Sequence, residues 1–311
     1  MTLNLVMNNN NVISGSNNTS YKYTFIQPTA ILDEAEMAVS NITIPYSWFN
    51  ISAANNNNTF NFYFPDSSST GTGYFVTLQD GFYSVTDINA ALQQFCIANG
   101  LYLINASGKY VYYLTILYNP TFYAVQVVAQ FVPLSLPSGW SQPANWPGFN
   151  ANPSPFTPIL GVSSEGFGNV IGFETGLFPP NNVTETSTLS TFTPQGSIVN
   201  SLIVRCSLVD NDCGFPTDVL DIIPITSSFG TNINYQPTQL KWMKLSSGVF
   251  QSVIITFVDQ NLNSIVARDS NVCISILLKN KGKIISDSSN EQEGRNQKLV
   301  QRLAVKLEER E

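Results

Sequence analysis

Four aspartates lie close together in the chain, and acidic oxygens are the ligands that calcium prefers. Asp210, Asp212, Asp218 and Asp221 occupy positions 1, 3, 9 and 12 of an EF-hand loop. The sixth position of such a loop needs glycine for its sharp turn, but here it is Phe215, and strand-like sequence flanks the segment. We therefore predict an ordinary strand-connecting turn, with a calcium loop as the weaker alternative, and we expect no metal site.

Two glycine-rich segments are the next candidates for chemistry. Residues 166–172 read GFGNVIG, which has the spacing G-x-G-x-x-x-G rather than that of a dinucleotide loop, and no βαβ pattern surrounds them. Residues 161–166 miss the G-x-S-x-G pattern of a nucleophile elbow. We predict a glycine-bent strand over 166–172 and no cofactor-binding residues.

The chain contains no histidine. Histidine is the commonest general base and the commonest transition-metal ligand, and it activates serine and cysteine nucleophiles. We therefore expect a protein that is not an enzyme and has no catalytic residues. A glycosidase that works with carboxylates alone is the remaining catalytic alternative. Cys96, Cys206, Cys213 and Cys273 show no C-x-x-C spacing, which favours buried free thiols.

The composition points away from several classes of partner. Of the 311 residues 43% are hydrophobic and only 11% are charged, and the net charge is −7. The polar surface must consist largely of Asn, Ser, Thr and Gln, which suits burial against neighbouring proteins, although an AT-rich coding genome would also enrich Asn. The basic residues of the body form no stripe, so nucleic acid is not an expected partner of the β body. There is no apolar run of membrane-spanning length and no signal peptide, so we expect no membrane partner.

The elements that would position any site are mostly strands. Residues that alternate or are rich in β-branched and aromatic types predict strands over 21–26, 37–44, 59–64, 74–78, 101–104, 110–118, 122–132, 197–209, 219–225, 239–245, 249–258 and 272–278. Only residues 86–98 predict a helix in the body, with an apolar face from Ile88 to Phe95 and Gly100 at its end. Ser84 and Thr86 are equally good caps for its start.

Three segments fall outside this pattern. Residues 1–20 are rich in Asn and Ser, which predicts a flexible N-terminal arm. Residues 133–158 hold seven prolines with Trp140 and Trp146, which predicts a long irregular excursion, near 133–195, inside a β domain of residues 21–280. Whether that β region is one domain or two stays open.

Residues 281–311 form a charged C-terminal tail that we expect to be partly helical. Residues 279–311 carry eight of the fourteen Lys and Arg residues and six of the twenty-one Asp and Glu residues. Leu299, Leu303 and Leu307 fall on one face of a helix. A helix this short is marginal alone, so it needs a partner surface to become ordered.

Clustered aromatic residues allow two interpretations. Trp48 with Phe49, and Tyr21 with Tyr23, could form a sugar-binding platform. Aromatic residues also fill the cores of large β sandwiches, and we favour the core.

Six phrases of the sequence together resemble the minor capsid (penton-type) proteins of virophages and Polinton-like viruses. In order from Ser40 to Lys279 they are SNITIPYSWFNIS, NNNTFNF, VTLQDGFYSVTDINAALQQF, FGNVIGFETGLFPP, SIVNSLIVRCSLVDN and SGVFQSVIITFVDQNLNSIVARDSNVCISILLK. The resemblance implies an all-β jelly-roll sandwich. It further implies a structural virion protein that forms a homopentamer at the icosahedral five-fold vertices, beside a double-jelly-roll major capsid protein. Such a protein is assembled inside the host cell and located in the virion. The alternative is a viral β spike protein that binds a receptor or glycan.

Overall fold

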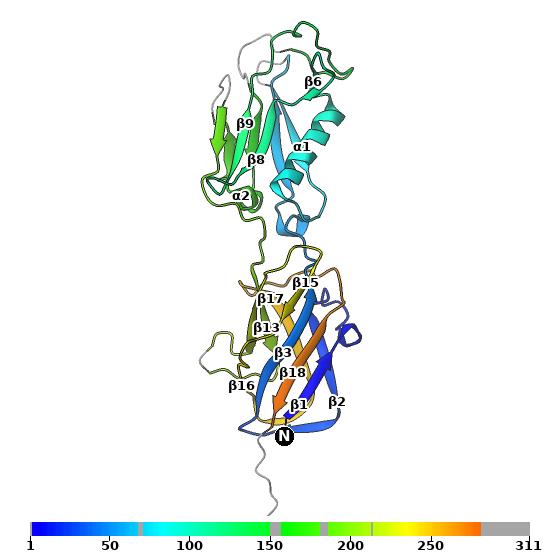
Figure 1. The fold of residues 1–311 in the computed structure, drawn as a ribbon, viewed down its shortest axis with the longest axis vertical. Coiled ribbons are helices and arrows are strands. Elements are labelled where there is room, and N and C mark those ends of the chain that lie inside the picture. The colour runs from blue at the N-terminus through cyan, green and yellow to red at the C-terminus, as the bar shows by residue number, and fades with distance from the viewer. Residues whose placement is uncertain (1, 68–70, 150–156, 181–185, 213, 281–311) are drawn as a thin grey trace, which may run out of the picture. The chain divides into compact units, whose positions relative to one another are not determined.

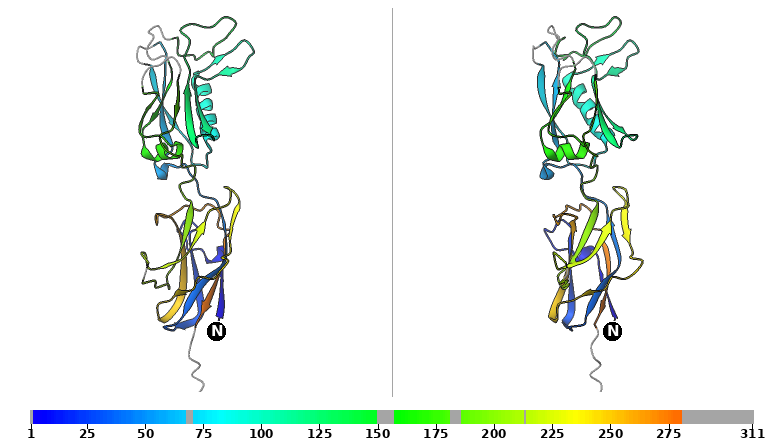
Figure 2. Two further views of the ribbon diagram at one scale, coloured as in Figure 1. Left: turned by 60° about the vertical axis from the view of Figure 1, so that its left-hand side comes forward. Right: turned by 90° about the vertical axis from the view of Figure 1, so that its left-hand side faces the viewer.

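The computed structural model describes residues 2–67, 71–149, 157–180, 186–212 and 214–280 (Figures 1 and 2). The chain divides into two compact units, Met1–Ser47 with Ser201–Glu311 and Trp48–Asn200. We call them the jelly-roll unit and the inserted unit. The β region, which the sequence left open as one domain or two, is divided between these two units. The expected bounds of the excursion, near 133–195, are corrected, because the inserted unit begins at Trp48 and has a core of its own.

The jelly-roll unit consists of two antiparallel sheets. One sheet has the order β1 (Thr2–Met7), β18 (Cys273–Lys279), β3 (Glu36–Pro45) and β15 (Asn232–Tyr235), and the short β16 (Met243–Lys244) also pairs with β3. The other has the order β14 (Val219–Pro224), β13 (Ser201–Cys206), β17 (Gly248–Asp259) and β2 (Ser20–Ile31). The first strand pairs with the last and the second with the next to last, which is the winding of a jelly roll. The predicted all-β jelly-roll class is confirmed.

Alternation along the strands explains the core between these sheets. In β13 the side chains of Leu202, Val204 and Cys206 are buried, while the residues between them face outward. The Cys206 sulfur lies 3.6 Å from the sulfur of Met37 in β3, so side chains from the two sheets meet directly. The inward set is apolar, and a slip of one residue would turn it toward water.

The first residues of the chain are not a flexible arm. Strand β1 pairs with β18 from Thr2 opposite Lys279 to Met7 opposite Ile274. Leu5 and Met7 are buried, and this two-residue period is the signal that the Asn-rich composition obscured. Residues 9–11 then form a short 3-10 helix, η1 (Asn9–Asn11), capped by the side chain of Asn8.

The inserted unit combines three small antiparallel sheets with two helices. The elements are η2 (Ala53–Asn55), β4 (Thr59–Phe64), β5 (Thr72–Thr77), α1 (Val85–Asn99), β6 (Leu103–Ile104), β7 (Tyr110–Val111), β8 (Leu114–Asn119), β9 (Ala124–Ala129), β10 (Ile159–Val162), α2 (Glu165–Ile171), β11 (Gly176–Phe178) and β12 (Thr186–Leu189). The sheets have the orders β11-β10-β4-β5, β12-β9-β8 and β6-β7. Helix α1 lies beside β8 (Figure 1). Alternate aromatic residues of β4 point into a core to which both α-helices and most of the other strands contribute.

Helix α1 confirms the helix expected over 86–98 and settles its start. The Ser84 side chain accepts a hydrogen bond from the backbone N–H of Asp87, and the Asp87 carboxylate accepts one from the backbone N–H of Ser84. This reciprocal capping box makes Ser84 the cap rather than Thr86. Gly100 ends the helix with a φ of 70°, a left-handed conformation that favours glycine.

Helix α2 contradicts the glycine-bent strand expected over 166–172. The Ser164 side chain accepts a hydrogen bond from the backbone N–H of Phe167 and starts a helix that Gly172 ends. The Phe167 ring stacks on Phe60 of β4, with ring centroids 4.9 Å apart. Burial of this face outweighs the low helix propensity of Gly166 and Gly168.

The proline-rich segment is irregular in its described part, as its composition predicts. Within residues 130–149 no regular strand or helix occurs. The segment nevertheless covers the inserted core, because Trp146 contacts Phe64 at 5.6 Å and Phe149 at 5.2 Å between ring centroids. The strand expected over 239–245 is reduced to Met243–Lys244, and that over 110–118 is split into β7 and β8. The tail of residues 281–311 lies outside the described residues.

Candidate assembly surfaces

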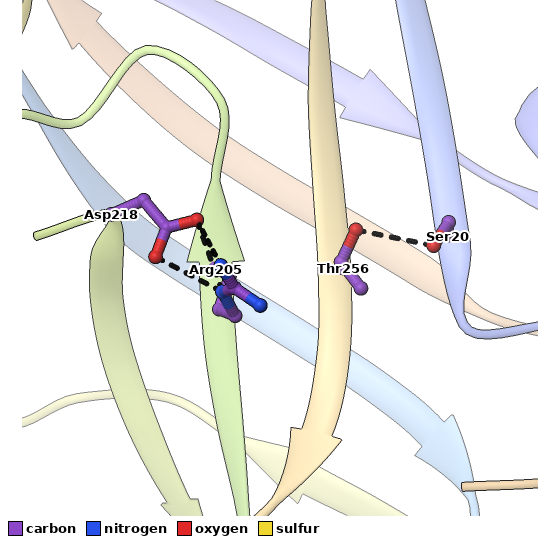
Figure 3. A network of polar contacts seen from close by, with 4 residues as sticks. All are labelled: Ser20, Arg205, Asp218 and Thr256. Atoms are coloured by element: carbon purple, nitrogen blue, oxygen red, sulfur yellow. Dashed lines mark hydrogen bonds and ion pairs between the residues drawn. The ribbon is translucent and has the colours of Figure 1, made fainter. Parts of the chain in front are cut away.

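The four aspartates of the expected turn do not converge on one point. The guanidinium of Arg205 binds Asp218, with Nε 3.0 Å from both carboxylate oxygens and a terminal nitrogen 2.8 Å from one of them (Figure 3). Asp221 instead faces Lys241 and the hydroxyl of Tyr235, each at 2.8 Å. Among the described residues no group of three His, Cys, Asp or Glu side chains is placed to hold a metal ion.

The Arg205–Asp218 pair belongs to a polar row across one sheet of the jelly-roll unit. Arg205 on β13 is the register partner of Thr256 on β17, which in turn is opposite Ser20 on β2. The hydroxyls of Ser20 and Thr256 lie 3.1 Å apart (Figure 3). Neighbouring residues in the same strands, such as Tyr21 and Ile255, are buried, so this row lies on the outward face. That face is rich in hydrogen-bonding groups, and the charge of its arginine is neutralised.

The inserted unit contains few charged residues. Residues 48–200 contain one basic residue, Lys109, and six acidic ones, which are Asp66, Asp80, Asp87, Glu165, Glu174 and Glu185. Soluble domains ordinarily have about a quarter of charged residues. The surface of this unit therefore depends on amides, hydroxyls and exposed rings, which is a composition suited to contact with neighbouring subunits.

An exposed aromatic turn joins β8 to β9. Phe122 and Tyr123 are 66% and 62% exposed, and the Tyr123 ring stands edge-on to Tyr118 with centroids 6.2 Å apart. Tyr123 has a φ of 49°, which is uncommon for a bulky residue. The backbone N–H of Thr121 donates to the Asn119 side chain and holds the turn. Sequence reasoning missed this site, although Asn119-Pro120 before two aromatic residues was its signal.

The outer strands of the inserted sheets also lack the usual protection against pairing. Strands β5, β8 and β12 lie at sheet ends and contain no charged residue and no proline. Phe75 on β5 is 79% exposed. Natural proteins commonly place lysine or proline on such edges to prevent association. These edges are therefore candidates for contact with another protein surface.

Two of the four aromatic residues singled out in the sequence are buried, and the other two, Phe49 and Tyr23, are half-buried. Trp48 and Tyr21 are buried, so the core interpretation is confirmed for both. Tyr21 stands edge-on to Phe257 with centroids 6.1 Å apart, and its hydroxyl donates to the backbone carbonyl of Asn18. Burial, together with the charge of Asp269, raises the pKa of Tyr21 to about 12.

The prediction of buried free thiols holds for two of the three cysteines that the structure describes. Cys96 and Cys206 are free and buried, and burial raises the pKa of Cys96 to about 12 and that of Cys206 to about 11. Thiols with such pKa values are poor nucleophiles at neutral pH. Cys273 is free but exposed, because its side chain lies on the outward face of β18, and Cys213 lies outside the described residues.

Across the described residues, no helix combines the length and the apolar character needed to cross a membrane. No protein-family model and no curated protein sequence matches the chain.

Solved structures that are similar to the chain include a penton protein and a chain from a virophage. One is the mavirus penton protein, with 10% identity and a TM-score of 0.45 over 89% of this chain and 98% of that one. The other is from the Sputnik virophage, with 10% identity and a TM-score of 0.37 over 89% of this chain and 97% of that one. The six sequence phrases resemble penton-type proteins of virophages. In line with this resemblance, one of these two solved structures is a penton protein and the other is a chain from a virophage.

Proposed function

We propose that the chain is a structural virion protein, the penton (minor capsid) subunit at the icosahedral five-fold vertices. It acts as a homopentamer beside a double-jelly-roll major capsid protein, is located in the virion, and has a structural rather than a catalytic role. The observation that carries the proposal is the jelly-roll winding, in which β1 pairs with β18 and β2 pairs with β17. The positions of the six resembling sequence phrases on the strands and helices of the fold support it.

Those phrases coincide with the framework of both units. SNITIPYSWFNIS covers the end of β3, and VTLQDGFYSVTDINAALQQF covers the end of β5 and most of α1. FGNVIGFETGLFPP covers most of α2 and all of β11, and SIVNSLIVRCSLVDN covers β13. The last phrase contains β17 and β18. The resemblance therefore involves the elements that build the fold rather than one local motif.

The surface chemistry supports a ring of copies. A ring of five copies requires a head-to-tail contact between two different faces of the subunit. The inserted unit offers uncharged sheet edges and exposed rings, and the jelly-roll unit offers the nearly neutral row from Ser20 to Asp218. Such faces can meet without burying unpaired charge, which would be costly.

The proposal is tested by the mass and symmetry of the purified full chain. Native mass spectrometry is expected to show a species of five times the 34.2 kDa chain, and negative-stain images are expected to show five-fold rings. Antibodies to the chain should label the vertices of particles. Monomers alone across protein and salt concentrations, with no vertex labelling, would overturn the proposal.

A second candidate function is a viral β spike protein that binds a receptor or glycan. The exposed rings of Tyr118, Phe122 and Tyr123 favour it, because sugars stack on such rings. A glycan array probed with the full chain tests this function. Binding that is lost in Phe122→Ala and kept in Phe75→Ala, where the ring on β5 is also largely exposed, would support it. The absence of any glycan signal, or equal loss in both variants, would exclude it.

A further inference from the structure

Three tyrosine rings gather at the two-stranded sheet of β6 and β7 in the inserted unit. The ring centroids of Tyr102 and Tyr110 lie 4.6 Å apart, with an angle of 44° between the ring planes. The ring centroid of Tyr112 lies 6.3 Å from that of Tyr102. Two tilted rings at the shorter of these separations are in van der Waals contact. We call Tyr102 and Tyr110 the tyrosine pair.

The register of β6 and β7 explains the contact within the tyrosine pair. Ile104 on β6 lies opposite Tyr110 on β7, and Tyr102 directly precedes β6, two residues before Ile104. Residues two apart along an extended chain share a face, so Tyr102 and Tyr110 are diagonal neighbours on one face of the hairpin. Aromatic side chains are long enough to reach each other across such a diagonal. The contact therefore follows from the pairing of the two strands.

Hydrogen bonds hold the hairpin on both sides of β6. The Asn105 side chain accepts from the backbone N–H groups of Ser107 and Lys109 at 3.0 Å and 2.9 Å, which fixes the turn between β6 and β7. Ile104 exchanges two backbone hydrogen bonds of 2.9 Å with Ser141 on its other side. The two rings are thus held close together by the fold, and a reaction between them needs no further ordering of the chain.

The two rings differ in their access to solvent. Tyr110 is 50% exposed, whereas Tyr102 is only 8% exposed. Burial, and after it the neighbouring Tyr110, raises the pKa of Tyr102, so Tyr102 is a neutral phenol at neutral pH. A reagent in solution can reach the Tyr110 ring directly. Tyr102 can exchange an electron with the Tyr110 ring that it contacts.

We propose that Tyr102 and Tyr110 are a site of dityrosine cross-linking, with a one-electron oxidant of the peroxidase or photochemical class as the co-reactant. The link joins the residue before β6 to the first residue of β7 and closes the hairpin covalently. These strands share only two register pairs, Leu103 with Val111 and Ile104 with Tyr110, so a covalent link restrains them further. The reaction does not depend on the proposed function, because it takes place within one copy of the chain.

The reaction removes two electrons and two protons from the tyrosine pair. Each phenol gives one electron to the oxidant and its hydroxyl proton to water, which leaves a phenoxyl radical on each ring. The radicals combine through a new C–C bond between the ring carbons adjacent to the C–O carbons. The hydrogen atom on each of these carbons then transfers to the phenoxyl oxygen of the same ring, which restores two phenols. Two equivalents of the oxidant are each reduced by one electron.

Photochemical oxidation of the full chain tests the proposal, with a ruthenium tris-bipyridyl complex as sensitiser and persulfate as electron acceptor. Cleavage before Asp87 and after Lys109 releases a peptide in which Tyr102 is the only tyrosine. Mass spectrometry is expected to find this peptide joined to Tyr110 with the loss of two hydrogen atoms. In an equal mixture of isotopically light and heavy chains, the link is expected within single copies. Mixed links at the statistical level, or no link at Tyr102, would overturn the proposal.

A second pair of tyrosines in the inserted unit separates the effect of ring contact from that of exposure. Tyr118 and Tyr123 are 43% and 62% exposed, and their ring centroids lie 6.2 Å apart at 80°. Coupling requires ring carbons in contact, so the link between Tyr102 and Tyr110 is expected in about fivefold higher yield than one between Tyr118 and Tyr123. The reverse order would show that exposure decides and would refute the proposal.

Matched variants complete the test. Tyr110→Phe keeps the ring but removes the phenol, and it should reduce the link to Tyr102 at position 110 by about tenfold or more, whereas Tyr118→Phe should leave that link within about twofold. Oxidation should also slow hydrogen exchange in residues 103–111 of the unsubstituted chain, and it should not do so in Tyr110→Phe. Equal yields in the two variants, or unchanged exchange once the link has formed, would contradict the proposal.

Discussion

The hydroxyl of Tyr235 donates a hydrogen bond to the carboxylate of Asp221 at 2.8 Å and thereby joins the two sheets of the jelly roll. Asp221 lies on β14 and Tyr235 on β15, and each of these strands is the outermost of its sheet. The Asp221 side chain is only 3% exposed and also accepts bonds from Lys241 and the backbone N–H of Ile222. A buried carboxylate with all these donors holds the edge of the sandwich closed.

Replacement of Tyr235 by phenylalanine should therefore destabilise the protein. The buried carboxylate would lose one charged hydrogen bond, with an expected cost of about 1.5–3 kcal/mol in the free energy of unfolding. Urea denaturation measures it. Tyr123→Phe, at an exposed ring, is the control and should change stability by less than about 0.5 kcal/mol. Equal effects in the two variants would show that the Asp221–Tyr235 bond contributes nothing.

Stability should fall at alkaline pH, because the fold favours the protonated form of buried tyrosines. The pKa of Tyr21 is raised to about 12, chiefly by burial and further by Asp269, while an unfolded tyrosine titrates near pH 10. A group whose pKa is raised on folding contributes its full stability below the unfolded value and loses it as pH rises through the folded value. For Tyr21 this window runs from about pH 10 to pH 12.

The variant Tyr21→Phe should flatten the decline in unfolding free energy across that window. Denaturant titrations at several pH values between 9 and 12 provide the measurement, and Tyr23→Phe, at a half-buried ring, serves as the comparison. A slope in Tyr21→Phe as steep as that of the unsubstituted chain would contradict the assignment.

Loss of the α1 cap should cost stability at one defined position. Ser84→Ala removes both the acceptor for the Asp87 backbone N–H and the hydroxyl that donates to its carboxylate at 2.6 Å. The expected cost is about 1 kcal/mol. Thr86→Ala, which changes an exposed hydroxyl just inside the helix, should cost clearly less. The reverse order would assign the cap to Thr86.

The same cap predicts the pH range in which acid lowers the stability of the protein. Hydrogen bonds from Ser84 lower the pKa of Asp87, so its contribution is present above the unfolded value of about 3.9 and is lost as pH falls through the lower folded value. The chain has no histidine, and stability should therefore stay level between about pH 8 and pH 5. Thermal melting at stepwise lower pH tests this, and a sharp loss near pH 6.5 would contradict it.

A methyl group at Gly168 should disrupt the inserted unit. An added Cβ there would collide with the backbone carbonyl oxygen of Phe173, and no flexible side chain can move aside to relieve it. Gly168→Ala is expected to lower stability by about 1–3 kcal/mol. It should also raise hydrogen exchange over residues 159–178. Gly196→Ala, where an added methyl meets nothing within 4 Å, is the control and should behave like the unsubstituted chain.

Local pattern alone determined the strand-rich character, the position of α1 and the absence of histidine chemistry. Period-two runs such as Met37–Ile44 and the Ser84–Asp87 spacing are short-range signals, and each depends only on residues a few positions apart. The small number of charged residues in 48–200 could also be read from the sequence. Only the structure shows that these residues form one compact unit with a weakly charged surface.

Contacts between residues far apart in the chain decided which other segments became strands or helices and which partners the acidic side chains bind. Whether Thr2–Met7 becomes a strand depends on β18, more than 260 residues later. Whether GFGNVIG becomes a helix depends on the burial of Phe167 against Phe60. Asp218 and Asp221 are three residues apart, yet one binds Arg205 and the other binds Lys241 and Tyr235. Pairing between distant strands and burial of one face override local propensity, because their free energies are larger than the intrinsic preferences of single residues.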